Sequence, residues 1–228
     1  NTYIGYLAGY TNNANYNVFM GNGAGEFATG VANSVVIGRQ ALGGAAADGD
    51  NNVAVGYQAG YNATTGNGNV FMGAGAGHGA TTAQKNVVIG NNAGYVLGTH
   101  NASTIIGFEA CRLMEAGSGG NAVLGYQALY SGTQNYQNTA IGINAGRKVT
   151  GASSNNVYIG SAAGPSSAGA ESNKLYINNA EGTPLIGGDF STDTVEFNGT
   201  AEFNDTDGNR HLTIMETGTN NALLSGAN

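Results

Sequence analysis

A glycine that recurs at nearly constant spacing constrains this chain more than any other feature of its sequence. Each of these glycines closes a short apolar run, and the set is Gly5, Gly21, Gly38, Gly56, Gly73, Gly90, Gly107, Gly125, Gly142 and Gly160. Successive members are 16, 17, 18, 17, 17, 17, 18, 17 and 18 residues apart. Alanine stands three residues after every one, and Asn or Ser stands four residues before it. Repetition at a fixed period indicates a stacked repeat architecture.

The three residues before each of these glycines predict a strand, because they are mostly apolar or β-branched and are flanked by turn formers. A period of about 17 residues is too short for a repeat built from a helical hairpin. Glycine inside a helix would also cost about 1 kcal/mol relative to alanine. We therefore expect an all-β fold, a parallel β-roll solenoid of about ten coils with two short strands in each coil.

Both faces of the predicted strands are apolar. Side chains alternate between faces along a strand, so the middle residue points one way and the outer two point the other. In Val87-Val88-Ile89, for example, all three are apolar. A narrow roll has one interior face, so the second face needs another chain, and we predict a homo-oligomer with this strand near its axis. The repeated glycines would permit tight turns, and the repeated Asn residues would form an amide ladder between coils.

Units such as Asn86-Val87-Val88-Ile89-Gly90-Asn91-Asn92-Ala93-Gly94 resemble the head repeat of trimeric autotransporter adhesins of the YadA type. They also resemble the same repeats in bacteriophage tail fibres and phage-like injection-system fibres. The resemblance covers residues 1 to about 164, although the polar links here are longer than those of the adhesin head. It implies a left-handed parallel β-roll, a homotrimer, and a place in a virion or extracellular fibre that attaches to a surface.

Composition changes near Pro165 and the period is lost. Residues 1–170 carry five basic and five acidic residues, whereas residues 171–228 carry two basic and nine acidic ones. We therefore divide the chain into a YadA-like β-roll repeat domain, 1–164, and an acidic β-rich stem or connector, 165–228, intertwined between chains. Short strands are expected at 174–177, 194–197, 201–203 and 211–215. Residues 172–179 and 184–190 resemble the part of phage-type fibres that follows such repeats, which favours a tail fibre over an adhesin.

Four tyrosines, Tyr10, Tyr61, Tyr95 and Tyr130, recur five residues after a repeat glycine and are the candidate binding residues. One interpretation is an aromatic ladder that covers an edge of the roll. The other is a stripe that stacks on the sugar rings of a surface glycan. Tyrosine, with its apolar body and polar tip, suits either role.

The sequence predicts no cofactor and no metal site. Gly73-Ala74-Gly75-Ala76-Gly77 lacks the helix and acidic residue of a dinucleotide fingerprint. Asp205, Asp207, Asn209 and Glu216 match part of a calcium loop, but Arg210 takes the place of its required glycine, so a polar turn is the primary interpretation and a cation site the alternative. His78, His100 and His211 share no ligand spacing and are interpreted as isolated surface residues. Cys111 is expected to be a buried apolar thiol.

These observations favour a structural and attachment protein, not an enzyme, in a phage tail fibre. The expected partners are two further copies of the chain, a cell-surface glycan or protein receptor, and other fibre or baseplate proteins. The net charge of −7 argues against nucleic acid, and no apolar run is long enough for a membrane span. We read the chain as a segment of a longer protein. The alternatives are the head of a bacterial trimeric adhesin and a glycan-processing fibre enzyme, which would need a cleft with paired carboxylates.

Overall fold

The computed structural model describes residues 1–114, 119–132 and 134–199. Within these ranges the protein is all-β, without an α-helix, and no helix there could cross a membrane. The strands are β1 (Thr2–Ile4), β2 (Val18–Met20), β3 (Val35–Ile37), β4 (Val53–Val55), β5 (Val70–Met72), β6 (Val87–Ile89), β7 (Thr104–Ile106), β8 (Ala122–Leu124), β9 (Gln134–Tyr136), β10 (Thr139–Ile141), β11 (Ala152–Ser154), β12 (Val157–Ile159), β13 (Lys174–Ile177), β14 (Ile186–Asp189) and β15 (Thr194–Phe197).

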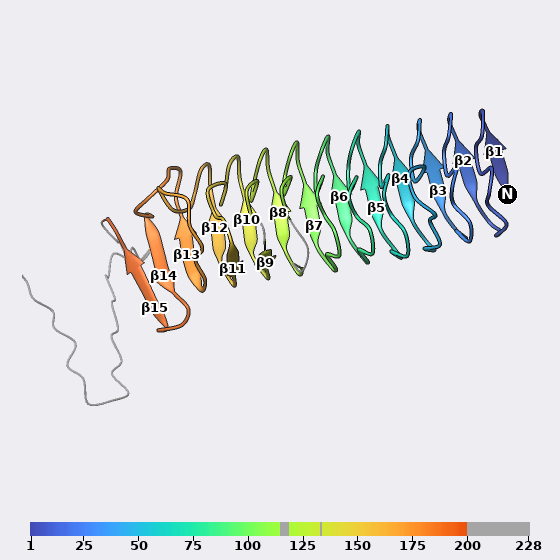
Figure 1. Ribbon diagram of the computed structural model, residues 1–228. Coiled ribbons are helices and arrows are strands. Elements are labelled where there is room, and N and C mark those ends of the chain that lie inside the picture. Colours follow the sequence, from blue (N-terminus) through green and yellow to red (C-terminus); the bar gives the residue numbers. More distant parts are fainter. Residues whose placement is uncertain (115–118, 133, 200–228) are drawn as a thin grey trace, which may run out of the picture. The chain divides into compact units, whose positions relative to one another are not determined.

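The main sheet has 13 strands in the order β1 to β8, then β10, β12, β13, β14 and β15. From β1 to β13 every pairing is parallel and equivalent repeat positions face each other, as Val88 faces Ile105. The strands lie side by side in sequence order, each joined to the next by a looped link (Figure 1). A parallel β-solenoid of about ten coils of roughly 17 residues is therefore confirmed, and the strand in each predicted unit lies where the repeat placed it.

One strand residue from each coil points into the interior of the solenoid. These are the middle residues of the strands, and from β2 onward they are fully or almost fully buried: Phe19, Val36, Ala54, Phe71, Val88, Ile105, Val123, Ala140 and Tyr158. The alanine three residues after each repeat glycine packs opposite them and is equally buried from Ala24 to Ala163. The middle position thus faces the interior, and the outer two positions face away from it.

A ladder of buried amides joins the coils, as predicted. The Oδ1 atom of Asn69 accepts the backbone N–H of Asn86 at 3.1 Å, and Asn86 Oδ1 accepts the N–H of Ser103 at 2.9 Å. The Nδ2 group of Asn86 also donates to the carbonyl oxygen of His100 at 2.8 Å, across the coil. Serine continues the ladder because its hydroxyl accepts the same bond, as Ser103 does from Asn121 at 3.2 Å.

The repeat glycines are required by both conformation and space, which confirms the turn predicted for them. Gly90 has φ +137°, a region that residues with a Cβ rarely adopt. A Cβ on Gly90 would also lie 2.3 Å from the carbonyl oxygen of Gly107 in the next coil. Equivalent glycines therefore stack backbone on backbone, and the spacing between coils leaves no room for a side chain there.

The expectation of two strands in each coil is wrong for most coils. In the described part of the chain, a second sheet contains β9 and β11 alone, apart from the main row of strands (Figure 1). Elsewhere that side has turns and isolated bridges such as Gln84 with Asn101. A residue in the left-handed region ends each of these segments directly before the ladder Asn or Ser, for example Lys85 at φ 57° and Ala102 at φ 55°. That bend separates this side of each coil from the strand of the main sheet that follows it.

The end of the main sheet differs from the coils before it. Strand β13 still pairs in parallel with β12, whereas β14 pairs antiparallel with β13 and β15 antiparallel with β14. The strands predicted at 174–177 and 194–197 are confirmed as β13 and β15. Those predicted at 201–203 and 211–215 lie outside the described residues, as do Asp205, Asp207, Asn209 and Glu216.

Candidate functional site

From Gly56 to Gly142, the position five residues after each repeat glycine forms a column of stacked side chains along one edge of the solenoid. The rings of Tyr61 and His78 stack with centroids 5.1 Å apart, and those of His78 and Tyr95 with centroids 4.6 Å apart. Because coils follow each other at about the strand spacing of 4.8 Å, rings at equivalent positions meet face to face. Three of the four predicted tyrosines, Tyr61, Tyr95 and Tyr130, belong to this column.

Arginines continue the same column where tyrosine is absent. The guanidinium carbon of Arg112 lies 5.7 Å from the ring centroid of Tyr95 and 6.0 Å from that of Tyr130, and its Nη1 donates to the Tyr130 hydroxyl at 3.1 Å. Arg147 lies 5.6 Å from the Tyr130 centroid on the following coil. Such cation–π contacts each contribute roughly 0.5–1 kcal/mol at exposed sites. We call the residues Tyr61, His78, Tyr95, Arg112, Tyr130 and Arg147 the edge ladder.

Stacking within the edge ladder limits how its tyrosines could contact a sugar ring. Tyr95 has His78 on one face and Arg112 on the other, so neither face is open to a sugar ring. Tyr10 stands apart from the ladder and is 71% exposed. Contact of the ladder tyrosines with a glycan stays a prediction, and it would use their hydroxyls and ring edges. The prediction from tyrosines alone did not include His78, Arg112 and Arg147. These residues stand at the same offset of five residues from a repeat glycine.

The interpretation of the three histidines as surface residues is wrong for His100. His100 is fully buried, and its Nδ1 atom contacts the carbonyl oxygen of Leu97. Desolvation lowers the pKa of His100, although the contact with Leu97 opposes this shift, and half-burial in the edge ladder lowers the pKa of His78. His211 lies outside the described residues. Cys111 is buried as expected, and burial raises the pKa of its thiol.

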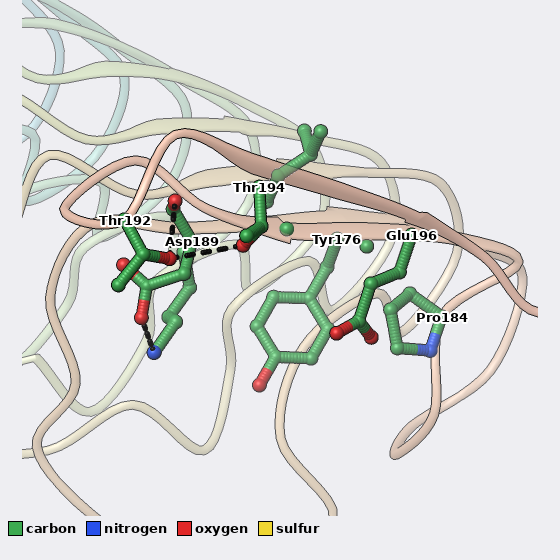
Figure 2. Close-up of a pocket in the computed structure, with 10 residues that line it drawn as sticks. Tyr176, Pro184, Asp189, Thr192, Thr194 and Glu196 are labelled. Carbon is green, nitrogen blue, oxygen red and sulfur yellow. Dashed lines mark hydrogen bonds and ion pairs between the residues drawn. The ribbon is translucent and has the colours of Figure 1, made fainter. Parts of the chain in front are cut away.

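A pocket of about 580 Å³ opens on the sheet formed by β13, β14 and β15. It lies on the face that continues the solenoid interior, because Tyr176 pairs in register with the buried Tyr158 and with Gly187 of β14. Figure 2 shows the ring of Tyr176 between the side chain of Glu196 and the group formed by Asp189, Thr192 and Thr194. The face that is apolar in the coils therefore becomes a polar, open surface here.

The charges of this pocket come from one ion pair and one further carboxylate. Lys174 pairs with Asp189 through its ammonium group. Hydrogen bonds from Lys174, and from the hydroxyl and backbone N–H of Ser191, lower the pKa of Asp189 to about 2. Glu196 also lines the pocket, and in the described part of the chain its side chain has neither a hydrogen bond nor an ion pair.

The pocket thus brings two carboxylates together, an arrangement that the sequence did not reveal. Glycoside hydrolysis needs one carboxylic acid with a raised pKa to protonate the leaving group. The pKa of Asp189 is shifted in the opposite direction, so Asp189 is unsuited to that role. No group of three or more His, Cys, Asp or Glu side chains that could hold a metal ion occurs among residues 1–114, 119–132 and 134–199.

The outer face of the main sheet is a third candidate surface. The third residue of each coil strand is always Ile, Met, Val or Leu and points away from the interior, with exposed fractions of 53% at Ile4, 51% at Leu124 and 41% at Ile141. Large side chains just after the repeat glycine border the same face, among them Phe108 and Tyr126, whose rings stack with centroids 5.4 Å apart. We call the outer residues of the main-sheet strands, from β1 to β15 without β9 and β11, the outer face.

Comparison with models of known protein families, with curated proteins and with solved structures finds no match for this chain.

Proposed function

We propose that this chain is a segment of a homotrimeric fibre, in which the outer face of each copy packs against the other copies, and that the fibre attaches to a cell surface. The observation that carries this proposal is the apolar outer face itself. Soluble monomers rarely expose contiguous apolar patches larger than a few hundred Å². Here such side chains recur on successive coils, and no outer position of the strands from β1 to β12 in the main sheet is charged.

The antiparallel end of the sheet supports the same assignment. In β13 to β15 the interior-side face is polar, with Lys174, Asp189 and Glu196. The outer face stays apolar there, with Leu175, Ile177, Ile186, Val195 and Phe197 at its registered positions. Val195 and Phe197 are 59% and 55% exposed. An apolar outer face where the opposite face is solvated indicates that the outer face has its own partner.

A second copy of the same chain is the partner that fits best. The apolar rows repeat once per coil, so two copies aligned coil to coil present matching rows at the same spacing of about 4.8 Å. In a cyclic trimer every subunit has the same surroundings, so each copy would contribute its outer face in the same way. The number three, the left-handed turn of the roll, the acidic stem and a place in a virion or on a cell surface follow from the family resemblance and are part of the proposal.

A bacterial trimeric adhesin head is the alternative function, because the same repeat and the same self-association would serve it. The two differ outside this segment. A membrane-anchor barrel encoded downstream would identify an adhesin, whereas a baseplate-binding region encoded upstream would identify a phage fibre. The order of domains in the full-length gene therefore separates them.

Solution mass tests the assembly directly. We expect light scattering to give three times the chain mass for the wild type, and the Ile89→Asp variant to dissociate because a carboxylate would be buried between copies. Thr65→Asp introduces the same charge at an exposed link position and should remain trimeric. Circular dichroism would show whether Ile89→Asp keeps its β-structure. A wild type that is monomeric at micromolar concentration would overturn the proposal.

A further inference from the structure

The column of side chains inside the solenoid ends at Tyr176, whose ring stacks on another ring with one of its two faces. Tyr176 stacks on Tyr158 with ring centroids 5.7 Å apart and an angle of 27° between the planes. On its other side the registered neighbour is Gly187, which has no side chain to continue the column. In the described part of the chain no ring stacks on the face of Tyr176 directed toward β14, and Tyr176 lines the pocket described above.

A hydrogen bond from its hydroxyl holds the ring of Tyr176 in place. The hydroxyl of Tyr176 donates to Glu171 Oε2 at 3.0 Å, and the hydroxyl of Tyr158 donates to Glu171 Oε1 at 2.8 Å. One carboxylate thus orients both rings of the stack. A binding platform that is already ordered costs little conformational entropy when a ligand settles on it.

Glycine at position 187 is required by the close approach of Pro184. Its φ does not lie in the left-handed region, so the backbone there would accept other residues. A Cβ at this position would lie 2.6 Å from Cγ of Pro184, which also lines the pocket. Glycine at 187 therefore lets Pro184 pack closely against this strand and form part of the pocket wall.

We propose that this pocket binds a neutral pyranose or amino sugar of a surface glycan, with the apolar face of the sugar ring stacked on Tyr176. A pyranose combines an apolar ring face with a rim of hydroxyls, and the pocket offers an aromatic face with polar groups around it. Thr192 and Thr194 lie on one side of the ring and Glu196 on the other (Figure 2). Few, well-placed polar groups around an apolar surface are typical of small-ligand sites.

The charges of the pocket select the class of sugar. Lys174 is neutralised by Asp189, so it is not free to bind an anion. Glu196 then leaves the pocket with one excess negative charge. A carboxylate can accept hydrogen bonds from two neighbouring hydroxyls, whereas the carboxylate of an acidic sugar beside it would be repelled. We therefore expect neutral hexoses or hexosamines to bind in preference to uronic or sialic acids.

This inference depends on the attachment role proposed above but does not depend on the trimer. The pocket and the outer face lie on opposite sides of the sheet, since Tyr176 and its neighbours Leu175 and Ile177 alternate along β13. Assembly through the outer face would leave the pocket accessible. Measuring mass and sugar binding on the same sample consequently separates a failure of the assembly proposal from a failure of the sugar site.

Titration of the full chain with galactose, N-acetylglucosamine and glucuronate, followed by calorimetry and NMR, tests the site. We expect saturable binding of at least one of the first two sugars and at least tenfold weaker binding of glucuronate. Glu196→Gln should weaken the observed binding about tenfold. Asp193→Asn is the matched control, because it removes a nearby exposed carboxylate that does not line the pocket, and it should bind as the wild type does.

Tyr176→Leu removes the platform and should abolish binding, with circular dichroism confirming that the strands remain. Gly187→Val should also weaken binding, because its side chain would displace Pro184 from the pocket wall. The inference would be overturned by the absence of saturable sugar binding to the wild type, or by binding that both Glu196→Gln and Tyr176→Leu leave unchanged. Preferred binding of glucuronate would overturn the assignment to neutral and amino sugars.

Discussion

The Oδ1 atom of Asn52 accepts two hydrogen bonds from Asn69 in the next coil, from its backbone N–H at 2.9 Å and from its side-chain amide at 3.2 Å. Both residues are almost fully buried. The same relationship recurs along the solenoid, so each coil satisfies a buried backbone N–H of the coil after it. Because an unsatisfied buried polar group costs about 1–3 kcal/mol, this ladder holds coils in register as well as close together.

Replacing one member of this ladder tests its contribution. Asn69→Leu would leave the N–H of Asn86 and the carbonyl of Ala83 without their partners, and we expect the free energy of unfolding to fall by roughly 2–4 kcal/mol. Asn69→Ser should cost less, since Ser34 already accepts the equivalent N–H from Asn52 at 3.0 Å. Urea unfolding followed by circular dichroism measures both. Equal losses for the two variants would contradict the role assigned to the acceptor.

The repeat glycines should tolerate no side chain. Gly90→Ala places a Cβ at φ +137° and against the backbone of Gly107, so a loss of about 1–3 kcal/mol from backbone strain, and more from the clash, is expected. Gly169→Ala is the control, because a Cβ there meets nothing within 4 Å and its φ lies outside the left-handed region. Thermal unfolding of the two variants should differ clearly. A melting temperature unchanged by Gly90→Ala would show that coils can separate locally at no cost.

Two buried or half-buried histidines predict that stability falls in acid. The pKa of both His78 and His100 is lowered in the folded chain, from an ordinary value of 6.5. As the pH falls below about 6.5 the unfolded chain takes up protons that the folded chain resists, so unfolding becomes more favourable. Above that pH both states hold neutral histidine and the contribution is constant.

His100→Leu should reduce this pH dependence by removing the more deeply buried of the two groups. The measurement is the melting temperature at pH 7.5 and pH 5.0 for the wild type and the variant. Carboxylates that titrate at lower pH affect both proteins alike, so the difference between them isolates His100. An identical fall in melting temperature for both proteins would contradict the assignment.

Coupling within the edge ladder is measurable by a double-mutant cycle. Tyr95→Leu and Arg112→Met each remove one partner of a contact with 5.7 Å between the guanidinium carbon and the ring centroid. We expect a coupling energy of roughly 0.5–1 kcal/mol, in the range of exposed cation–π pairs. The pair Tyr57 and Tyr95, on separate columns and coils, provides a control cycle with no expected coupling. Coupling indistinguishable from zero for Tyr95 and Arg112 would mean that the column is stacked without energetic consequence.

The sequence by itself determined the coil. The spacing of the repeat glycines located the strand in each unit, the three-residue apolar run placed Val88 and its equivalents on one face, and the recurring Asn predicted the ladder. These features are local and recur in every unit, so they can be recognised from the sequence repeat alone. Only the three-dimensional structure showed that most coils have a single strand, because in most links the backbone pairs between coils through turns and isolated bridges.

The binding surfaces depended on tertiary structure for a different reason. Tyr61, His78 and Tyr95 share a fixed offset from the repeat glycine, but only the structure showed that their rings stack on each other. The pocket needs Tyr176, Gly187 and Glu196 from three strands, the last two in an antiparallel register that no repeat specifies. His100 is fully buried, and no periodic position in the sequence marks it as a core residue. Periodic positions could be predicted from the chain, whereas contacts made at the aperiodic end of the sheet depended on how the strands pair.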